Sequence, residues 1–77
     1  MSADHFEIII ELLLERQPFR AFTVRLKSGE RLEIDHPTAI NVLGSVAVLN
    51  APASIPIYFD HDCVSSIYDA PASDVPN

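Results

Sequence analysis

The stretch 22–34 constrains the fold most, because its pattern is that of a single β-hairpin. Apolar and polar residues alternate on both sides of a Ser-Gly pair, which is the period of strands with one buried face. A two-residue loop at that pair would place apolar side chains opposite charged ones. A three-residue loop over 27–29 instead places Val24 opposite Leu32. We therefore predict this loop, with a type I turn and Gly29 in the left-handed conformation of a β-bulge.

A helix is predicted before the hairpin, over about residues 4–16. Asp4 is a suitable N-cap, and a glutamate follows it three residues later, as in a capping box. Pro18 ends the helix, since the residue before a proline is pushed out of the α region. The apolar stripe is widened by Ile8 and Leu12, so we expect the helix to bury more than one face.

The segments after the hairpin are short. Pro37 breaks the chain after the second strand, because proline has no N–H for a ladder. The expected elements are a helical turn or packed loop at 38–44, a strand at 45–50, a turn and disordered tip at 51–54, a strand at 55–59, a turn at 60–62 and a strand at 63–68. Val64 and Ile67 are three residues apart, so the last strand needs a bulge or a 3₁₀ turn at its start.

One helix and five short strands predict a single α+β domain over residues 1–69. The favoured architecture is an N-terminal helix and a small, strongly bent five-stranded antiparallel sheet, closed as an SH3-like or Sm-like barrel. Small sheets curl in this way to bury one face and remove edges. A helix packed on an open antiparallel sheet is the alternative. Residues 70–77 consist mainly of Ala, Pro, Ser and Asp, so we expect a disordered C-terminal tail.

Charge and composition limit the partners. The net charge is −6, and all five bases lie between Arg16 and Arg31. The negative electrostatic field of such a protein opposes binding to nucleic acid and to anionic membranes, so neither is an expected partner. Apolar residues make up 48% of this small chain, which favours contact with another subunit and hence a homo-oligomer. No apolar run is long enough to span a membrane.

Two features favour a cytoplasmic location. Cys63 is the only cysteine, and an unpaired cysteine suggests a reducing compartment. The N-terminus lacks the basic start of a signal peptide. We expect Cys63 to be a buried core thiol, because it begins an apolar strand.

The chain resembles two families of proteins. Pro18-Phe-Arg-Ala-Phe22, Leu26-Lys-Ser-Gly29 and His36-Pro37 together resemble a group of short uncharacterised bacterial proteins, a resemblance that implies no activity. The order of elements resembles the Sm-like family. Leu26-Lys-Ser-Gly29 is similar to the turn of that family's first motif, and the apolar spacing of 59–67 is similar to its second motif. This second resemblance implies an Sm-like fold and ring-type assembly.

The chain departs from the Sm-like pattern at the positions that serve RNA. Asp60-His61 stands where the family has Arg-Gly or Lys-His, and an acid there repels phosphate. Ile34 stands near the position of the glycine that lets the second strand bend. Asn41 is the candidate for the base-holding Asn, but its spacing from Gly29 is shorter than the family pattern. These departures argue against RNA binding.

Candidate site residues fall into two groups. Those that could face an anion or ligand are Arg20, Arg25, Lys27, Arg31, Tyr58 and Tyr68. The weak metal candidates are His36, Asp60, His61 and Asp62, provided that the strand ends meet. Asp and His also suit strand ends and turns for local hydrogen bonding, so no metal is favoured. No catalytic residue and no cofactor are expected.

The leading hypothesis for function is a small non-enzymatic module for interaction and oligomerisation. It would self-associate through strand edges and the apolar helix, and bind an unknown protein partner or small ligand. The alternatives are an Sm-like RNA or nucleotide binder that uses the basic hairpin face, and a metal-binding protein that uses Asp and His at strand ends.

Overall fold

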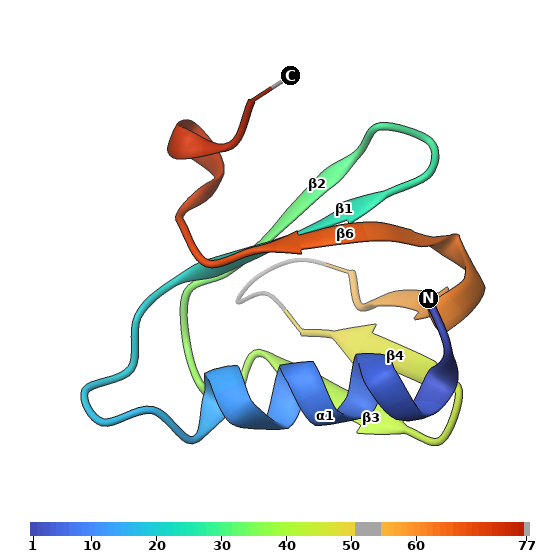
Figure 1. Cartoon of the computed structure of the whole chain (residues 1–77), viewed down its shortest axis with the longest axis horizontal. Coiled ribbons are helices and arrows are strands. Elements are labelled where there is room, and N and C mark those ends of the chain that lie inside the picture. Colours follow the sequence, from blue (N-terminus) through green and yellow to red (C-terminus); the bar gives the residue numbers. More distant parts are fainter. Residues whose placement is uncertain (51–54, 77) are drawn as a thin grey trace.

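A computed structural model describes residues 1–50 and 55–76 (Figure 1). The helix and strands in these ranges are α1 (Ala3–Leu14), β1 (Phe22–Leu26), β2 (Arg31–Ile34), β3 (Ile40–Leu43), β4 (Val46–Leu49), β5 (Ile57–Asp60) and β6 (Val64–Tyr68). Two 3₁₀ turns, η1 (His61–Cys63) and η2 (Ala72–Asp74), precede and follow β6. The turn expected at 51–54 lies outside the described residues.

The strands form two separate antiparallel sheets. Sheet A has the order β2-β1-β6, and sheet B has the order β3-β4-β5. The predicted single sheet of five strands, whether closed as a barrel or open, is therefore wrong, although the α+β class is confirmed. The division has a local cause: the chain leaves sheet A after Ile34 and enters sheet B at Ile40, and Pro37 between them cannot donate to a ladder.

The hairpin at the start of sheet A has the predicted register. Val24 pairs with Leu32, as a three-residue loop requires. Gly29 has φ +96° and its N–H donates to the Leu26 carbonyl over 2.9 Å, while the Leu26 N–H donates to the Glu30 carbonyl over 2.8 Å. The bulged turn at Gly29 is thus confirmed.

Sheet B begins with an element that the sequence did not predict. Residues 40–43 form strand β3, not a helical turn or loop. Gly44, with φ +65°, lies in the two-residue connection that brings β4 back antiparallel, so that Val42 pairs with Ala47. A left-handed glycine suits such a tight hairpin as well as it suits the end of a helical turn.

The last strand has the irregular start that its apolar spacing predicted. The 3₁₀ turn η1 precedes β6, and the pairing of β6 with β1 shifts register between Arg25 and Leu26. Both irregularities together allow Val64 and Ile67 to pack inward.

Helix α1 differs from the prediction at both ends and on its outer face. It is capped by Ser2, whose hydroxyl accepts from the His5 N–H over 3.2 Å, and it ends at Leu14. Asp4 lies inside the first turn, where its negative charge still favours the helix N-terminus. The expectation that a wide stripe is buried is wrong for the single chain, because Ile8 and Leu12 are exposed.

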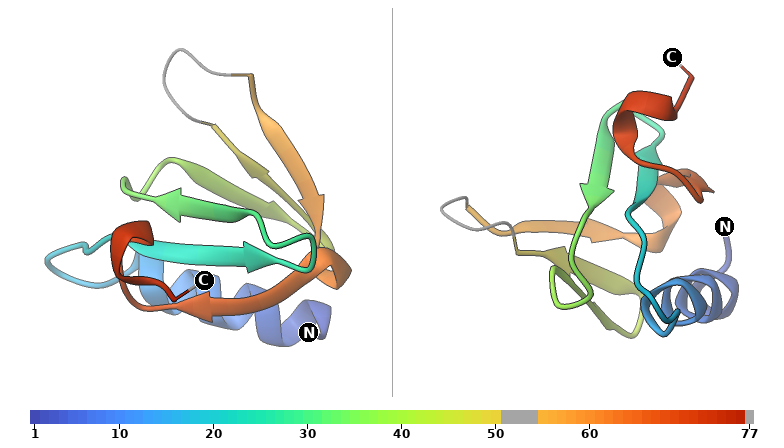
Figure 2. Two further views of the ribbon diagram at one scale, coloured as in Figure 1. Left: turned by 90° about the horizontal axis from the view of Figure 1, so that it is seen from above. Right: turned by 90° about the vertical axis from the view of Figure 1, so that its left-hand side faces the viewer.

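The core lies between the two sheets and α1. Figure 2 shows the sheets steeply inclined to one another with α1 alongside them. The core cluster contains residues of α1 and of both sheets: Phe6, Ile10, Phe22, Val24, Leu32, Ile34, Ala39, Ile40, Ala47, Leu49, Phe59 and Val64. The rings of Phe6 and Phe59 meet edge to face, with centroids 6.1 Å apart, and join α1 to sheet B. The inner faces of both sheets are therefore buried in the core of the single chain.

The outer faces of the two sheets differ. Residues 70–76, for which the sequence predicts disorder, lie against the outer side of sheet A, with η2 next to β2 and Val75 buried (Figure 2). No described segment covers the outer face of sheet B in the same way. Within the described residues, no helix is long and apolar enough to cross a membrane.

Candidate functional site

The basic residues of the hairpin do not form a free cationic surface. Arg31 donates through Nη1 to the carbonyls of Val75, over 3.0 Å, and Ala72, over 3.4 Å. Hydrogen bonds with Ser66 and then with Arg25 lower the pKa of the Tyr68 hydroxyl. Two of the three hairpin bases therefore serve contacts within the chain.

Two further bases meet one carboxylate near the end of α1. Arg16 donates to Asp69 over 2.7 Å and also to the Arg20 carbonyl over 3.3 Å. The Arg20 guanidinium lies 3.7 Å from the same carboxylate. The hydrogen bond from Arg16, helped by the positive charges of Arg16 and Arg20, lowers the pKa of Asp69. The bases thus balance acids of the same chain.

The remaining anion-facing candidates do not share one site. Lys27 is exposed at the hairpin turn. Tyr58 belongs to sheet B and Tyr68 to sheet A, so the two tyrosines do not form a single stacking platform. Arg25, Arg31 and Tyr68 do share the outer face of sheet A, where Arg25 pairs with Arg31, and Lys27 and Tyr58 line one pocket. The six candidate residues therefore do not form a single site.

The metal candidates are also separated. His36 precedes β3, whereas Asp60 ends β5, and these positions lie at opposite ends of sheet B because β3 and β5 run in the same direction. Asp60, His61 and Asp62 do come together, with ligand atoms within 4.8 Å of one another. One ring nitrogen of His61 and the two carboxylates are the atoms that could hold an ion there.

Local hydrogen bonds account for the Asp-His-Asp cluster without an ion. His61 Nδ1 lies 2.8 Å from the Met1 carbonyl and 3.3 Å from the Asp62 carboxylate. The Asp60 carboxylate accepts from the Asp62 N–H over 3.1 Å and so caps η1. These contacts fix the N-terminus beside the turn into β6, which is a structural role.

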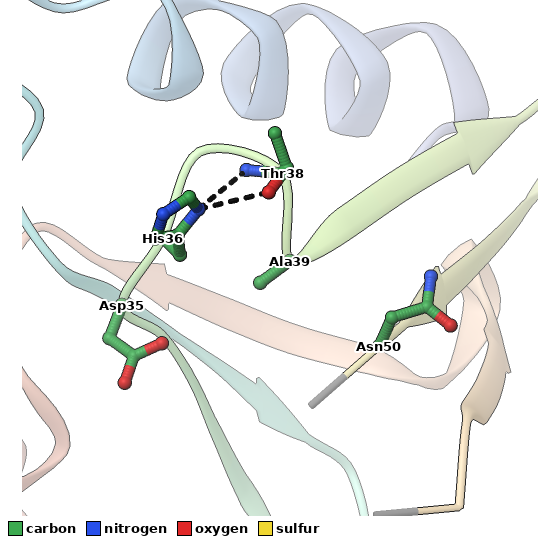
Figure 3. Close-up of a pocket in the computed structure, with 5 residues that line it drawn as sticks. All are labelled: Asp35, His36, Thr38, Ala39 and Asn50. Carbon is green, nitrogen blue, oxygen red and sulfur yellow. Dashed lines mark hydrogen bonds between the residues drawn. The ribbon is translucent and has the colours of Figure 1, made fainter. Parts of the chain in front are cut away.

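A pocket of about 350 Å³ lies where the chain crosses between the sheets (Figure 3). Its polar groups are Asp35, His36, Thr38 and Asn50. The His36 ring is turned toward Thr38, whose hydroxyl lies 2.9 Å from Nδ1, and Asn50 comes from the opposite side of the pocket. The Thr38 hydroxyl and the His36 imidazole are within hydrogen-bond distance, as a hydroxyl nucleophile and a base would be. The Thr38 N–H also donates to Nδ1 over 3.4 Å, so this ring nitrogen is part of a local turn. The polar groups of the pocket can hydrogen-bond a small polar molecule.

A second pocket, of about 380 Å³, lies between the hairpin turn and β5 and includes Lys27, Tyr58 and Cys63. Cys63 is exposed, so the expectation of a buried core thiol is wrong. Cys63 ends η1, and Val64 after it takes the inward position. The Cys63 carbonyl accepts from the Lys27 N–H over 2.8 Å, which ties β6 to the hairpin turn.

The most distinctive surface is the outer face of sheet B. The pairing register places Leu43 beside Val46 in one outward-facing row, and Val48 beside Tyr58 in the next outward-facing row, two residues along. Leu43 is 69% exposed, Tyr58 71% and Val46 36%. Val48 is almost buried but lies outside the core cluster. We call these four residues the sheet-B patch.

Two rows end in polar residues that bound the patch. Asn41 pairs with Val48 across β3 and β4, and Asp60 pairs with Val46 across β4 and β5. Asp60 is thus the one charged side chain in the two rows. Sequence reasoning missed this patch because it assigned 38–44 to a helical turn or loop. The alternation of inward Ile40 and Val42 with outward neighbours was the signal that could have shown it.

Comparison of the chain with protein-family models, curated proteins and solved structures found no match.

Proposed function

We propose that the protein is a self-associating interaction module, and that a second copy binds on the sheet-B patch. The observation that carries this proposal is the composition of that face. Leu43, Val46, Val48 and Tyr58 belong to two neighbouring outward rows of the pairing register, in which Asp60 is the only charged residue. Lys27 lines a pocket with Tyr58 at the β5 edge.

Burial of this patch is energetically favourable. Removing apolar surface from water contributes about 25 cal/mol per Å². Leu43 is 69% exposed and Tyr58 71% exposed, so burial of these two side chains in an interface would release most of that free energy. Contiguous apolar surface on a small domain is a common mark of a protein interface.

The shape of the patch suits a second sheet. It is the outer face of three antiparallel strands, and sheets pack face to face at a spacing of about 10 Å. The same face on a second copy has the same shape and composition. A two-fold contact would bring each patch against its own counterpart, as in most homodimers.

The charge distribution supports the same surface. Each copy has a net charge of −6, so two copies repel one another at long range. The two outward rows of sheet B contain one carboxylate, that of Asp60, so the repulsion between copies opposes contact little there. Salt screens the repulsion and should therefore strengthen association, whereas salt weakens binding that depends on phosphate contacts.

Amide chemical shifts of ¹⁵N-labelled protein across a dilution series test the proposal. We expect concentration-dependent shifts at the amides of β3, β4 and β5, and little change in β1 and β2. Shifts concentrated at Ile8 and Leu12 would place the interface on α1 instead. Spectra that do not change with concentration would contradict self-association.

A further inference from the structure

The outer side of sheet A presents three polar side chains to residues 70–76. Thr23 of β1 and Glu33 of β2 lie directly opposite one another in the pairing register, and Arg31 lies two residues before Glu33. Thr23 is fully buried, and it lies between Phe22 and Val24 of the core, so its side chain is on the opposite face of β1. We call Thr23, Arg31 and Glu33 the hairpin cradle.

The cradle binds the backbone of the segment that crosses it. The Thr23 hydroxyl donates to the Ala70 carbonyl over 2.8 Å. The Glu33 carboxylate accepts from the Ala72 N–H over 2.8 Å. Together with the two carbonyls that Arg31 contacts, every polar bond of the cradle goes to a main-chain atom.

One side chain of the segment adds an apolar anchor. Val75 is 5% exposed, yet it lies outside the core cluster, so its burial comes from docking on the outer side of the sheet. Pro71, with φ −66° and ψ 159°, begins η2 in an extended conformation. The cradle therefore suits a short peptide that has an extended proline-containing entry and a small apolar residue four positions later.

The segment itself has little capacity to order alone. Its residues are mainly Ala, Pro, Ser and Asp, a composition typical of disordered chain. Its order in the structure thus depends on the cradle. In sequence, the segment follows directly after Asp69. That residue comes after the end of β6 and contacts Arg16.

We propose that the hairpin cradle is a peptide-binding site that residues 70–76 occupy in cis, and that it accepts the same segment from a second copy in exchange. The ligand is recognised through its backbone groups and through Val75. This site is on sheet A and is independent of the sheet-B patch, so either proposal can fail without the other.

A labelled peptide spanning residues 69–77 tests the proposal in fluorescence anisotropy with full-length protein. In Val75→Asp the chain's own segment should detach, which leaves the cradle free to bind the probe. Wild-type protein should bind the probe at least about tenfold more weakly, because its own segment competes at a high effective concentration. Val75→Ala is a milder variant for the same purpose, should Val75→Asp not fold.

A second substitution in the Val75→Asp background tests whether the cradle is where the probe binds. Adding Arg31→Ala to Val75→Asp should weaken probe binding by about tenfold, because it removes a charge-assisted donor to two carbonyls. Lys27→Ala is the matched control: it removes the same charge from the same hairpin and should change nothing. Leu43→Glu should also leave probe binding unchanged.

Three outcomes would overturn the proposal. One is that neither Val75 variant binds the probe while circular dichroism shows both to be folded. Another is that wild-type protein binds the probe as tightly as the Val75 variants. The third is that Arg31→Ala has no more effect than Lys27→Ala.

Discussion

Replacement of Leu43 by glutamate should weaken self-association strongly and leave the stability of the monomer almost unchanged. Leu43 lies at the turn end of β3, is 69% exposed and is not part of the core cluster. The substitution therefore removes no core packing. Changes at such surface positions usually alter the free energy of unfolding by no more than about 0.5 kcal/mol.

The expected loss of association follows from the exposed fraction. Full burial of a leucine side chain contributes about 1.5–3 kcal/mol. Since roughly two-thirds of Leu43 is still exposed, burial against a second sheet contributes about 1–2 kcal/mol per copy. A two-fold contact contains the residue twice, so the loss is about 2–4 kcal/mol, or about 30- to 1,000-fold in the dimer Kd.

Sedimentation velocity over a concentration series measures this Kd, and thermal unfolding measures monomer stability. The matched control is Ile8→Glu, which adds the same charge at an exposed apolar position on α1. An unchanged Kd for Leu43→Glu would refute the reasoning. A Kd raised by Ile8→Glu alone would move the interface to α1.

Three further predictions concern the fold and its charges. Phe6→Ala should lower the free energy of unfolding by about 3–5 kcal/mol in chemical denaturation, because the ring is fully buried against Phe59; a loss below about 1 kcal/mol would mean that α1 does not close the core. Gly29→Ala should cost about 1–2 kcal/mol in the same assay through its φ of +96° alone, since no atom lies within 4 Å of the added Cβ; an unchanged stability would contradict the left-handed turn. The pKa of Asp69 is lowered by Arg16, so this contact should be complete above the unfolded-state pKa and lost only as the pH falls through the lower folded-state pKa. Carboxyl ¹³C titration measures this, and an Asp69 pKa at or above its ordinary value would contradict it.

The parts of the fold that the sequence predicts correctly depend on local pattern. The register of the 22–34 hairpin follows from side-chain alternation and one glycine, and neither depends on the rest of the chain. The irregular start of β6 follows in the same way from the spacing of Val64 and Ile67. Such features are determined within a few residues, so the sequence alone is enough.

The errors arise where two local patterns are alike or where tertiary contacts decide. Gly44 suits both a helix end and a tight hairpin, and only pairing with β4 distinguishes the two. The division into two sheets depends on how far the chain travels around Pro37. Cys63 lies at the boundary of an apolar strand, and the turn η1 places it outside.

The contacts of the candidate site residues were even harder to predict from local sequence than the fold. The partners of the basic residues lie far away in sequence: Arg31 of the hairpin contacts Val75, and Arg16 after α1 contacts Asp69. The charge pattern of 16–31 favours bases that balance acids of the same fold, with an anion-facing surface as the alternative. The contacts of Arg16 and Arg20 with Asp69 are of the first kind, but the pattern does not name the partner. The backbone-binding role of Thr23 had no local signal at all.

Sedimentation equilibrium of the wild-type protein at low and at high salt is the decisive test of self-association through the sheet-B patch. We predict a monomer–dimer equilibrium at micromolar concentrations, with an association constant that rises as salt screens the net charge of −6. A protein that remains strictly monomeric at both salt concentrations would contradict it. Association that weakens as salt is added would show that charge pairs, and not the apolar sheet-B patch, hold the copies together.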